Sequence, residues 1–161
     1  MLILGLDISK RMTGACIWDS DTGEALARNF KINLHSKEED RFYRAGSELA
    51  DFLISTYSEY EFDVIVLEDV FFGGNVETHR VLCSLSLVVD QLVFTGKLKT
   101  REFIKVQNMV WKSWLSKSQS SNVPVGLNTK LKTQNILNKL GYEFSGVGAE
   151  DRYDALGMCI G

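Results

Sequence analysis

Proline and cysteine are scarce in this sequence, and each scarcity argues against a class of protein. Among 161 residues there is one proline, Pro124, and there are three cysteines, at positions 16, 83 and 159. The cysteines form neither a CxxC pair nor a cluster with histidine, which argues against a disulfide framework or a zinc site. The single proline and an aromatic content of 11% argue against a disordered chain. We therefore expect a folded protein from a reducing compartment.

Long apolar runs are also absent. No stretch approaches the roughly 18 apolar residues of a membrane span. The apolar run at the N-terminus stops at Asp7, which is too short for the core of a signal peptide. No GxxxxGK[ST] loop is present to hold a nucleotide phosphate. We expect a cytoplasmic protein with neither a membrane partner nor a nucleotide cofactor.

The sequence has no overall excess of basic charge, because its formal net charge is −3 and its pI is about 5.4. A protein covered with basic residues for nucleic-acid binding would have a pI above about 9. The charges are nevertheless uneven, since residues 1–80 carry 8 basic and 15 acidic side chains and residues 81–161 carry 10 and 6. Nine basic residues and a single acid lie between Lys97 and Lys139. A solvated basic face and an anionic partner explain this block equally well.

Hydrophobic spacing predicts an α/β fold. Residues 2–7 are apolar on both alternating faces, as in a strand covered on both sides, and strands at 13–18 and 25–33 would complete an antiparallel meander. The remaining expected elements are a helix at 41–57 capped by Ser36, a strand at 64–67, a helix at 81–93, a strand at 101–106, a loop at 116–128, and helices at 129–140 and 150–160. We expect one domain, built on a mixed five-stranded sheet (the meander plus two parallel strands) with helices on both faces.

Two acidic residues stand at the ends of apolar strands. Asp7 ends the first strand, and Glu68 follows the buried run at 64–67. A buried, unpaired carboxylate costs several kcal/mol, so each of these groups needs compensation. Taken singly, Asp7 could cap a turn and Glu68 could pair with a lysine.

Two further acids, Asp151 and Asp154, lie three residues apart and therefore share one face of the last expected helix. Their charges repel each other unless a cation lies between them, although both could also favour the start of the helix. Together with Asp7 and Glu68 they offer the oxygen ligands that hard divalent cations prefer. Two such ions roughly 3.5–4 Å apart can promote phosphodiester cleavage.

Three segments of the sequence, with the acids in them, form a recognisable set: LGLDISKRMTG at 4–14, IVLEDVF at 65–71 and DRYDALGM at 151–158. A fourth, VGLNTKLKTQ at 125–134, is a weaker match. Together they resemble the RuvC-type Holliday junction resolvases of the ribonuclease-H-like superfamily. The order and spacing of these segments agree with the family over nearly the whole chain. The resemblance implies a single ribonuclease-H-like domain over residues 1–161, with a basic loop inserted around 113–128.

The resemblance also implies functional residues. Two Mg²⁺ (or Mn²⁺) ions would be bound by Asp7, Glu68, Asp151 and Asp154. Lys132, and with it Lys112, would contact the phosphate near the cut. Phe71 would stack at the branch point of the junction, although it could instead pack in the core, or exchange roles with Phe72. Further DNA contacts are expected from Asn75, Lys105, Lys117 and Lys130.

The implied activity is that of a homodimeric endonuclease, which resolves four-way junctions by paired nicks that leave 5′-phosphate and 3′-hydroxyl ends. We expect the helix at 81–93 to form the dimer interface, because its apolar stripe is broad. Departures from the family, such as the missing lysine before Asn75 and the asparagine at 128, favour a phage or viral member. The alternatives are a flap or branched-DNA nuclease, an RNA-processing nuclease of the same fold, and a non-catalytic junction-binding module.

Overall fold

The computed structural model describes residues 1–34, 40–71, 75–118 and 129–161, with the backbone alone at 129 and 130. Its centre is a five-stranded sheet in the order β3-β2-β1-β4-β5. β1 pairs antiparallel with β2 and parallel with β4, β2 pairs antiparallel with β3, and β4 pairs parallel with β5. The strands are β1 (Leu2–Ile8), β2 (Met12–Asp19), β3 (Ala25–Lys31), β4 (Glu61–Glu68) and β5 (Lys99–Val106). The predicted mixed sheet is confirmed.

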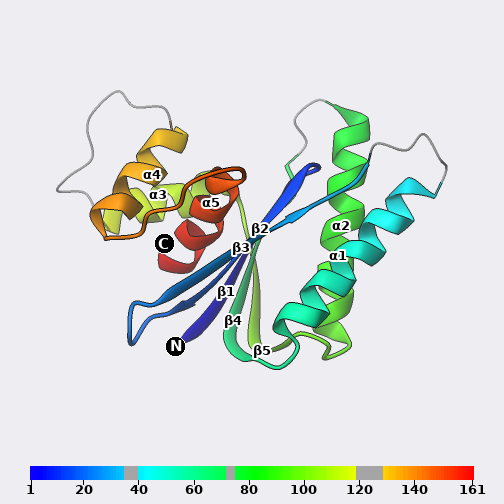
Figure 1. The fold of residues 1–161 in the computed structure, drawn as a ribbon, viewed down its shortest axis with the longest axis horizontal. Helices are drawn as coiled ribbons and strands as arrows, with labels where there is room; N and C mark the ends of the chain where they lie inside the picture. Colours follow the sequence, from blue (N-terminus) through cyan, green and yellow to red (C-terminus); the bar gives the residue numbers. More distant parts are fainter. Residues whose placement is uncertain (35–39, 72–74, 119–128) are drawn as a thin grey trace.

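Helices cover both faces of this sheet, as expected (Figure 1). α1 (Arg41–Tyr57) and α2 (Val76–Phe94) lie on one face, and α3 (Asn108–Ser118), α4 (Thr129–Lys139) and α5 (Ala149–Ile160) lie on the other. None of the helices in the described part of the chain is both long enough and apolar enough to cross a membrane.

The alternation of side chains along β1 separates its two environments. Leu4 and Leu6 are fully buried in the core that the sheet shares with α1 and α2. Ile3 points to the other face, where it packs with Trp111 of α3 and Met158 of α5. Because successive side chains of a strand point to opposite faces, Asp7 lies on the α3–α5 face with Ile3.

Two glycines let α5 approach the sheet. A Cβ atom at Gly5 of β1 would collide with the carbonyl oxygen of Ala155, and one at Gly14 of β2 would collide with that of Asp151. Backbone atoms of a packed helix cannot move aside as the end of a side chain can. The absence of a side chain at both positions therefore sets the distance between α5 and strands β1 and β2.

We predict that Gly14→Ala lowers the free energy of unfolding by about 1–3 kcal/mol, because the added methyl group overpacks the contact with α5. Thermal unfolding measures this change, at about 2–4 °C in Tm per kcal/mol. Gly46→Ala is the matched control, since its Cβ would meet only a methyl group of Val88, at 3.1 Å. Equal Tm values for the two variants would contradict the close contact at Gly14.

The main difference from the predicted elements is α3. The end of this helix covers residues 113–118, which we expect in an inserted loop, and the rest of that predicted loop, 119–128, lies outside the described residues. Trp111 and Leu115 are both buried, and this helical spacing identifies the face of α3 that packs on the sheet. The predicted cap Ser36 also lies outside the described residues, and Asp40 stands at the N-cap of α1.

Candidate active site

Asp7 and Glu68 lie next to each other at one end of the sheet. Leu6 of β1 pairs with Leu67 of β4 in parallel register, so the residues that follow them are also neighbours. Asp7 shares a face with Ile3, and Glu68 shares that face with Val66, which lies in the same core cluster as Ile3. Both acidic side chains are partly buried. The two strand-end acids predicted from the sequence therefore meet on the α3–α5 face.

α5 brings the other two acids to the same place. The close approach at Gly14 is to the backbone of Asp151, and Asp151 and Asp154 are both partly buried. The pKa of Asp7 is raised well above its usual value, first by burial and then by the negative charge of Glu68. The charges of Asp154 and Asp151 raise it further. The four predicted acids thus lie within electrostatic range of one another.

Lys112 of α3 is the positive charge inside this group. Its side chain is only 8% exposed, and its Nζ lies 3.2 Å from Oδ2 of Asp154. The same Nζ lies 4.7 Å from the centre of the Trp111 ring. Its charge lowers the pKa of both Asp7 and Glu68, against the effect of burial. Lys112, which we expect near the scissile phosphate, therefore lies among the acids.

Glu68 is held by two side chains that no sequence motif indicates, Asn108 and Trp111. Nδ2 of Asn108 donates to its Oε1 at 2.8 Å, and Nε1 of Trp111 donates to its Oε2 at 3.2 Å. Burial raises the pKa of Glu68, while these two hydrogen bonds lower it. Both donors belong to α3. The sequence does carry a signal for this helix, because its apolar residues at 110 and 114, and at 111 and 115, are four residues apart, as on one face of a helix.

The donor chemistry of the site fits a hard divalent cation, because four carboxylates supply oxygen ligands and their mutual repulsion favours added positive charge. The described side chains do not, however, include a ready group of three or more histidine, cysteine, aspartate or glutamate ligands. Lys112 binds Asp154, and Asn108 and Trp111 bind Glu68, so these carboxylates already have partners within the protein. The expected two-ion site remains a prediction.

The predicted DNA-contact residues fall into different environments. Lys105 points to the face covered by α2, where its Nζ lies 2.7 Å from Oδ1 of Asp90 and 3.2 Å from Oγ of Ser86. The alternation along β5 places Lys105 on the face opposite the four acids, because its neighbour Val106 packs with Trp111. A DNA contact by Lys105 would therefore lie on the face of the sheet opposite the four acids, and it stays a prediction.

The DNA contacts predicted for Lys117, Lys132, Asn75 and Lys130 also stay predictions. Lys117 is exposed at the end of α3, and Lys132 is partly exposed in the first turn of α4. Oδ1 of Asn75 accepts a hydrogen bond from the backbone N–H of Thr78 at 2.9 Å, so Asn75 caps α2. The Asn75 side chain is also exposed. The side chain of Lys130 lies outside those that the structure describes.

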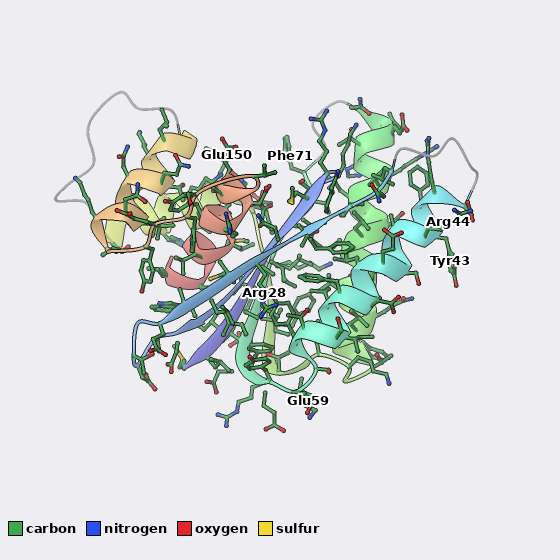
Figure 2. The ribbon with its side chains drawn as sticks, in the orientation of Figure 1. Arg28, Tyr43, Arg44, Glu59, Phe71 and Glu150 are labelled. Atoms are coloured by element: carbon green, nitrogen blue, oxygen red, sulfur yellow. The ribbon has the colours of Figure 1, made fainter. Side chains whose placement is uncertain are left out.

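Phe71 is 82% exposed, which excludes the alternative that it packs in the core. It lines a cavity of about 570 Å³ together with Glu68 and Met109, and Met109 is 75% exposed. Figure 2 shows Phe71 at the same end of the molecule as Glu150, near the start of α5. An exposed aromatic ring therefore stands beside Glu68. Phe72, the alternative aromatic, lies outside the described residues.

Comparisons with known proteins identify the fold. No family model matches this sequence, and the search of curated proteins finds no match. The structure of Thermus thermophilus RuvC in complex with a Holliday junction substrate matches with a TM-score of 0.61 at 15% identity, covering 98% of this chain and 90% of that chain. A second T. thermophilus RuvC structure gives 0.61 at 12% identity, covering 98% and 92%. A fowlpox virus resolvase in complex with its junction gives 0.45 at 14% identity, covering 99% and 95%. This chain therefore has the α/β, ribonuclease-H-like fold of RuvC.

Proposed function

We propose that this protein is a metal-dependent endonuclease that resolves four-way DNA junctions by paired, symmetric nicks. The observation that carries the proposal is the meeting of Asp7 and Glu68 with the acids of α5, where their charges raise the pKa of Asp7. The fold supports a nuclease, because T. thermophilus RuvC has the same fold in its complex with a Holliday junction substrate. The cut would leave a 5′-phosphate and a 3′-hydroxyl.

In the proposed enzyme, two Mg²⁺ ions, or Mn²⁺ in their place, are held by Asp7, Glu68, Asp151 and Asp154. When bound, the ions supply an activated water and stabilise the leaving oxygen. Lys112 would contact the phosphate near the cut, which requires its amine to leave Asp154, 3.2 Å away. Lys132 offsets negative charge that develops on the phosphate.

The surface beside the acids suits branched DNA. Phe71 is exposed next to Glu68, and an unpaired base stacked on an aromatic ring contributes roughly 1–3 kcal/mol to binding. Lys117 and Lys130 would bind the phosphate backbone, with the amide of Asn75 as a further contact. Lys105, whose amine is paired with Asp90 on the other face of the sheet, would contact DNA only away from the acids.

A homodimer would place two such sites about a two-fold axis, as paired nicks require. The groove between α1 and α2 supports this arrangement, because it is lined by Phe42, Tyr43 and Leu87 and has a volume of about 390 Å³. Tyr43 is 80% exposed and Leu87 is 56% exposed, and Figure 2 shows Tyr43 pointing outward from α1. The residues that line the groove belong to α1 and α2, which lie on the face of the sheet opposite the acids (Figure 1), so a partner bound there would leave the active site open to DNA.

We predict that Leu87→Glu converts the dimer into a monomer, because a buried charge in the interface lacks a partner. Light scattering after size-exclusion chromatography measures the mass, and the nicks on a junction should become unpaired. Leu26→Glu is the matched control, since Leu26 of β3 is 48% exposed and lies outside the groove. A wild-type protein that is already monomeric, or a Leu87→Glu variant that stays dimeric, would contradict this interface.

The proposed substrate is tested with a set of labelled DNA and RNA substrates at one Mg²⁺ concentration. We expect fast cutting of a four-way junction at symmetric positions in two opposite strands, and slow cutting of flaps, linear duplexes and structured RNA. Preferential cutting of flaps would identify a flap nuclease, and preferential cutting of RNA would identify an RNA-processing enzyme. Either result would overturn the proposed substrate while keeping the nuclease.

One observation favours a second candidate, a junction-binding module without catalysis. The ion pair between Lys112 and Asp154 neutralises one of the expected metal ligands, and the described residues include no ready group of three ligands. Calorimetric titration of the metal-free protein with Mg²⁺ separates the two candidates. The nuclease requires a binding signal that disappears in Asp7→Asn, whereas the module predicts junction binding without any Mg²⁺ signal.

A further inference from the structure

Helix α3 binds Glu68 through both of its carboxylate oxygens. Asn108 donates to Oε1 at 2.8 Å, and Trp111 donates to Oε2 at 3.2 Å. Each oxygen thus accepts one hydrogen bond from α3 in these two contacts. A carboxylate oxygen has two lone-pair directions, so these two hydrogen bonds occupy one direction on each oxygen. The contacts therefore orient the carboxylate without using its whole capacity.

Trp111 is fixed by packing as well as by its hydrogen bond. Its side chain is 1% exposed and belongs to the core cluster that contains Val66 of β4 and Met158 of α5. A Cβ atom at Gly157 of α5 would lie 2.7 Å from the Trp111 ring, so the indole lies directly against that helix. The indole therefore contacts Glu68 through the N–H of its five-membered ring and α5 through its six-membered ring.

Lys112 connects α3 to α5, the helix that carries Asp151 and Asp154. It follows Trp111 in α3, and its amine binds Asp154 of α5 at 3.2 Å. One turn of α3 thus contacts Glu68 from β4 and Asp154 from α5. The distance between β4 and α5 at the site depends on a helix that contributes no acid of its own.

We infer that Asn108 and Trp111 are positioning residues, which hold the Glu68 carboxylate in the orientation that binds a divalent cation. The inference rests on the proposed function, because it assigns these residues to the metal site of that function. Groups that hydrogen-bond a metal ligand fix its orientation, and their loss typically lowers metal affinity about 10–100-fold. Neither residue touches the substrate in this assignment, so their effect passes through Glu68.

The test measures Mg²⁺ affinity in the whole, metal-free protein by calorimetry. We expect Asn108→Ala and Trp111→Phe each to weaken Mg²⁺ binding about 10–100-fold. Trp111→Phe removes the N–H donor and keeps a smaller aromatic ring in the core. Asn108→Ala removes the other donor and leaves the Trp111 packing in place, so a loss shared by both variants reports the orientation of Glu68 rather than packing. Trp114→Phe is the matched control on the same helix, because Trp114 is 49% exposed and lies outside the acidic site.

Two further readouts separate positioning from a merely structural role. The Mg²⁺ concentration that gives half-maximal nicking should rise by the same factor as the dissociation constant, and saturating Mg²⁺ should restore most of the rate. Junction affinity in EDTA should stay unchanged. Wild-type Mg²⁺ affinity in both folded variants would overturn this inference and leave the proposed function intact. A wild-type protein that binds no Mg²⁺ would overturn the proposed function itself, and this inference with it.

Discussion

Replacing Asp7 by asparagine is expected to abolish Mg²⁺-dependent nicking of a four-way junction while leaving junction binding largely unchanged. Asparagine keeps the shape of the side chain but removes the charge at the centre of the acidic group, where the charges of Glu68, Asp154 and Asp151 all act on Asp7. Stabilisation by metal ions is worth several kcal/mol, and each 1.4 kcal/mol or so is a factor of ten, so the rate should fall about 10³-fold or more.

The comparison needs a binding assay and a matched control. Junction affinity is measured in EDTA for the wild type and the variant, and nicking is then measured after Mg²⁺ is added. Asp51→Asn serves as the control, because Asp51 is an exposed acid on α1, on the other face of the sheet. Nicking by Asp7→Asn at the wild-type rate would remove Asp7 from the catalytic group.

The same substitution is expected to stabilise the metal-free protein at neutral pH. Burial and the neighbouring acids raise the pKa of Asp7 well above its usual value, and burial also raises that of Glu68. A raised pKa means that the folded state binds the proton more tightly than the unfolded state does. The contribution of the Asp7 carboxyl to the free energy of unfolding is therefore fully present below its unfolded pKa of about 4. It is lost as pH rises through the pKa of the folded state.

Thermal unfolding in EDTA measures this effect. Relief of one buried charge should make Asp7→Asn about 0.5–2 kcal/mol more stable than the wild type at pH 7–8, a rise in Tm of about 1–8 °C. The difference should disappear as pH falls toward the unfolded pKa, because both proteins then carry a neutral side chain. Added Mg²⁺ should stabilise the wild type and have little effect on the variant. A variant that is less stable than the wild type at pH 8 would contradict the electrostatic account.

Much of the fold could be predicted because local patterns and tertiary contacts agree. The apolar run of β1 and that of β4 indicate buried strands, and both form the centre of the observed sheet. The acids at positions 7 and 68 were recognisable because a carboxylate at the end of a buried strand needs compensation. The helical spacing of residues 151 and 154 predicted that both lie on one face of α5, and both are partly buried.

The rest could not be predicted from local sequence, because it depends on which distant segments pack together. Asn108 is separated from Glu68 by 40 residues, and the contact exists only because α3 lies over the end of β4. Charge alone places Lys105 with its basic neighbours, although the alternation of side chains along β5 turns it toward Asp90. The block of positive charge between residues 97 and 139 is therefore divided between two faces of the sheet.

The central claim is that the acids at this end of the sheet make a metal-dependent nuclease for four-way junctions. The most direct measurement uses a synthetic immobile junction labelled on each strand in turn, incubated with the wild-type protein in Mg²⁺ or in EDTA. We predict paired cuts at symmetric positions in two opposite strands with Mg²⁺, and no cuts in EDTA. Equal cutting in EDTA, or a junction that is bound but left uncut in Mg²⁺, would contradict the account.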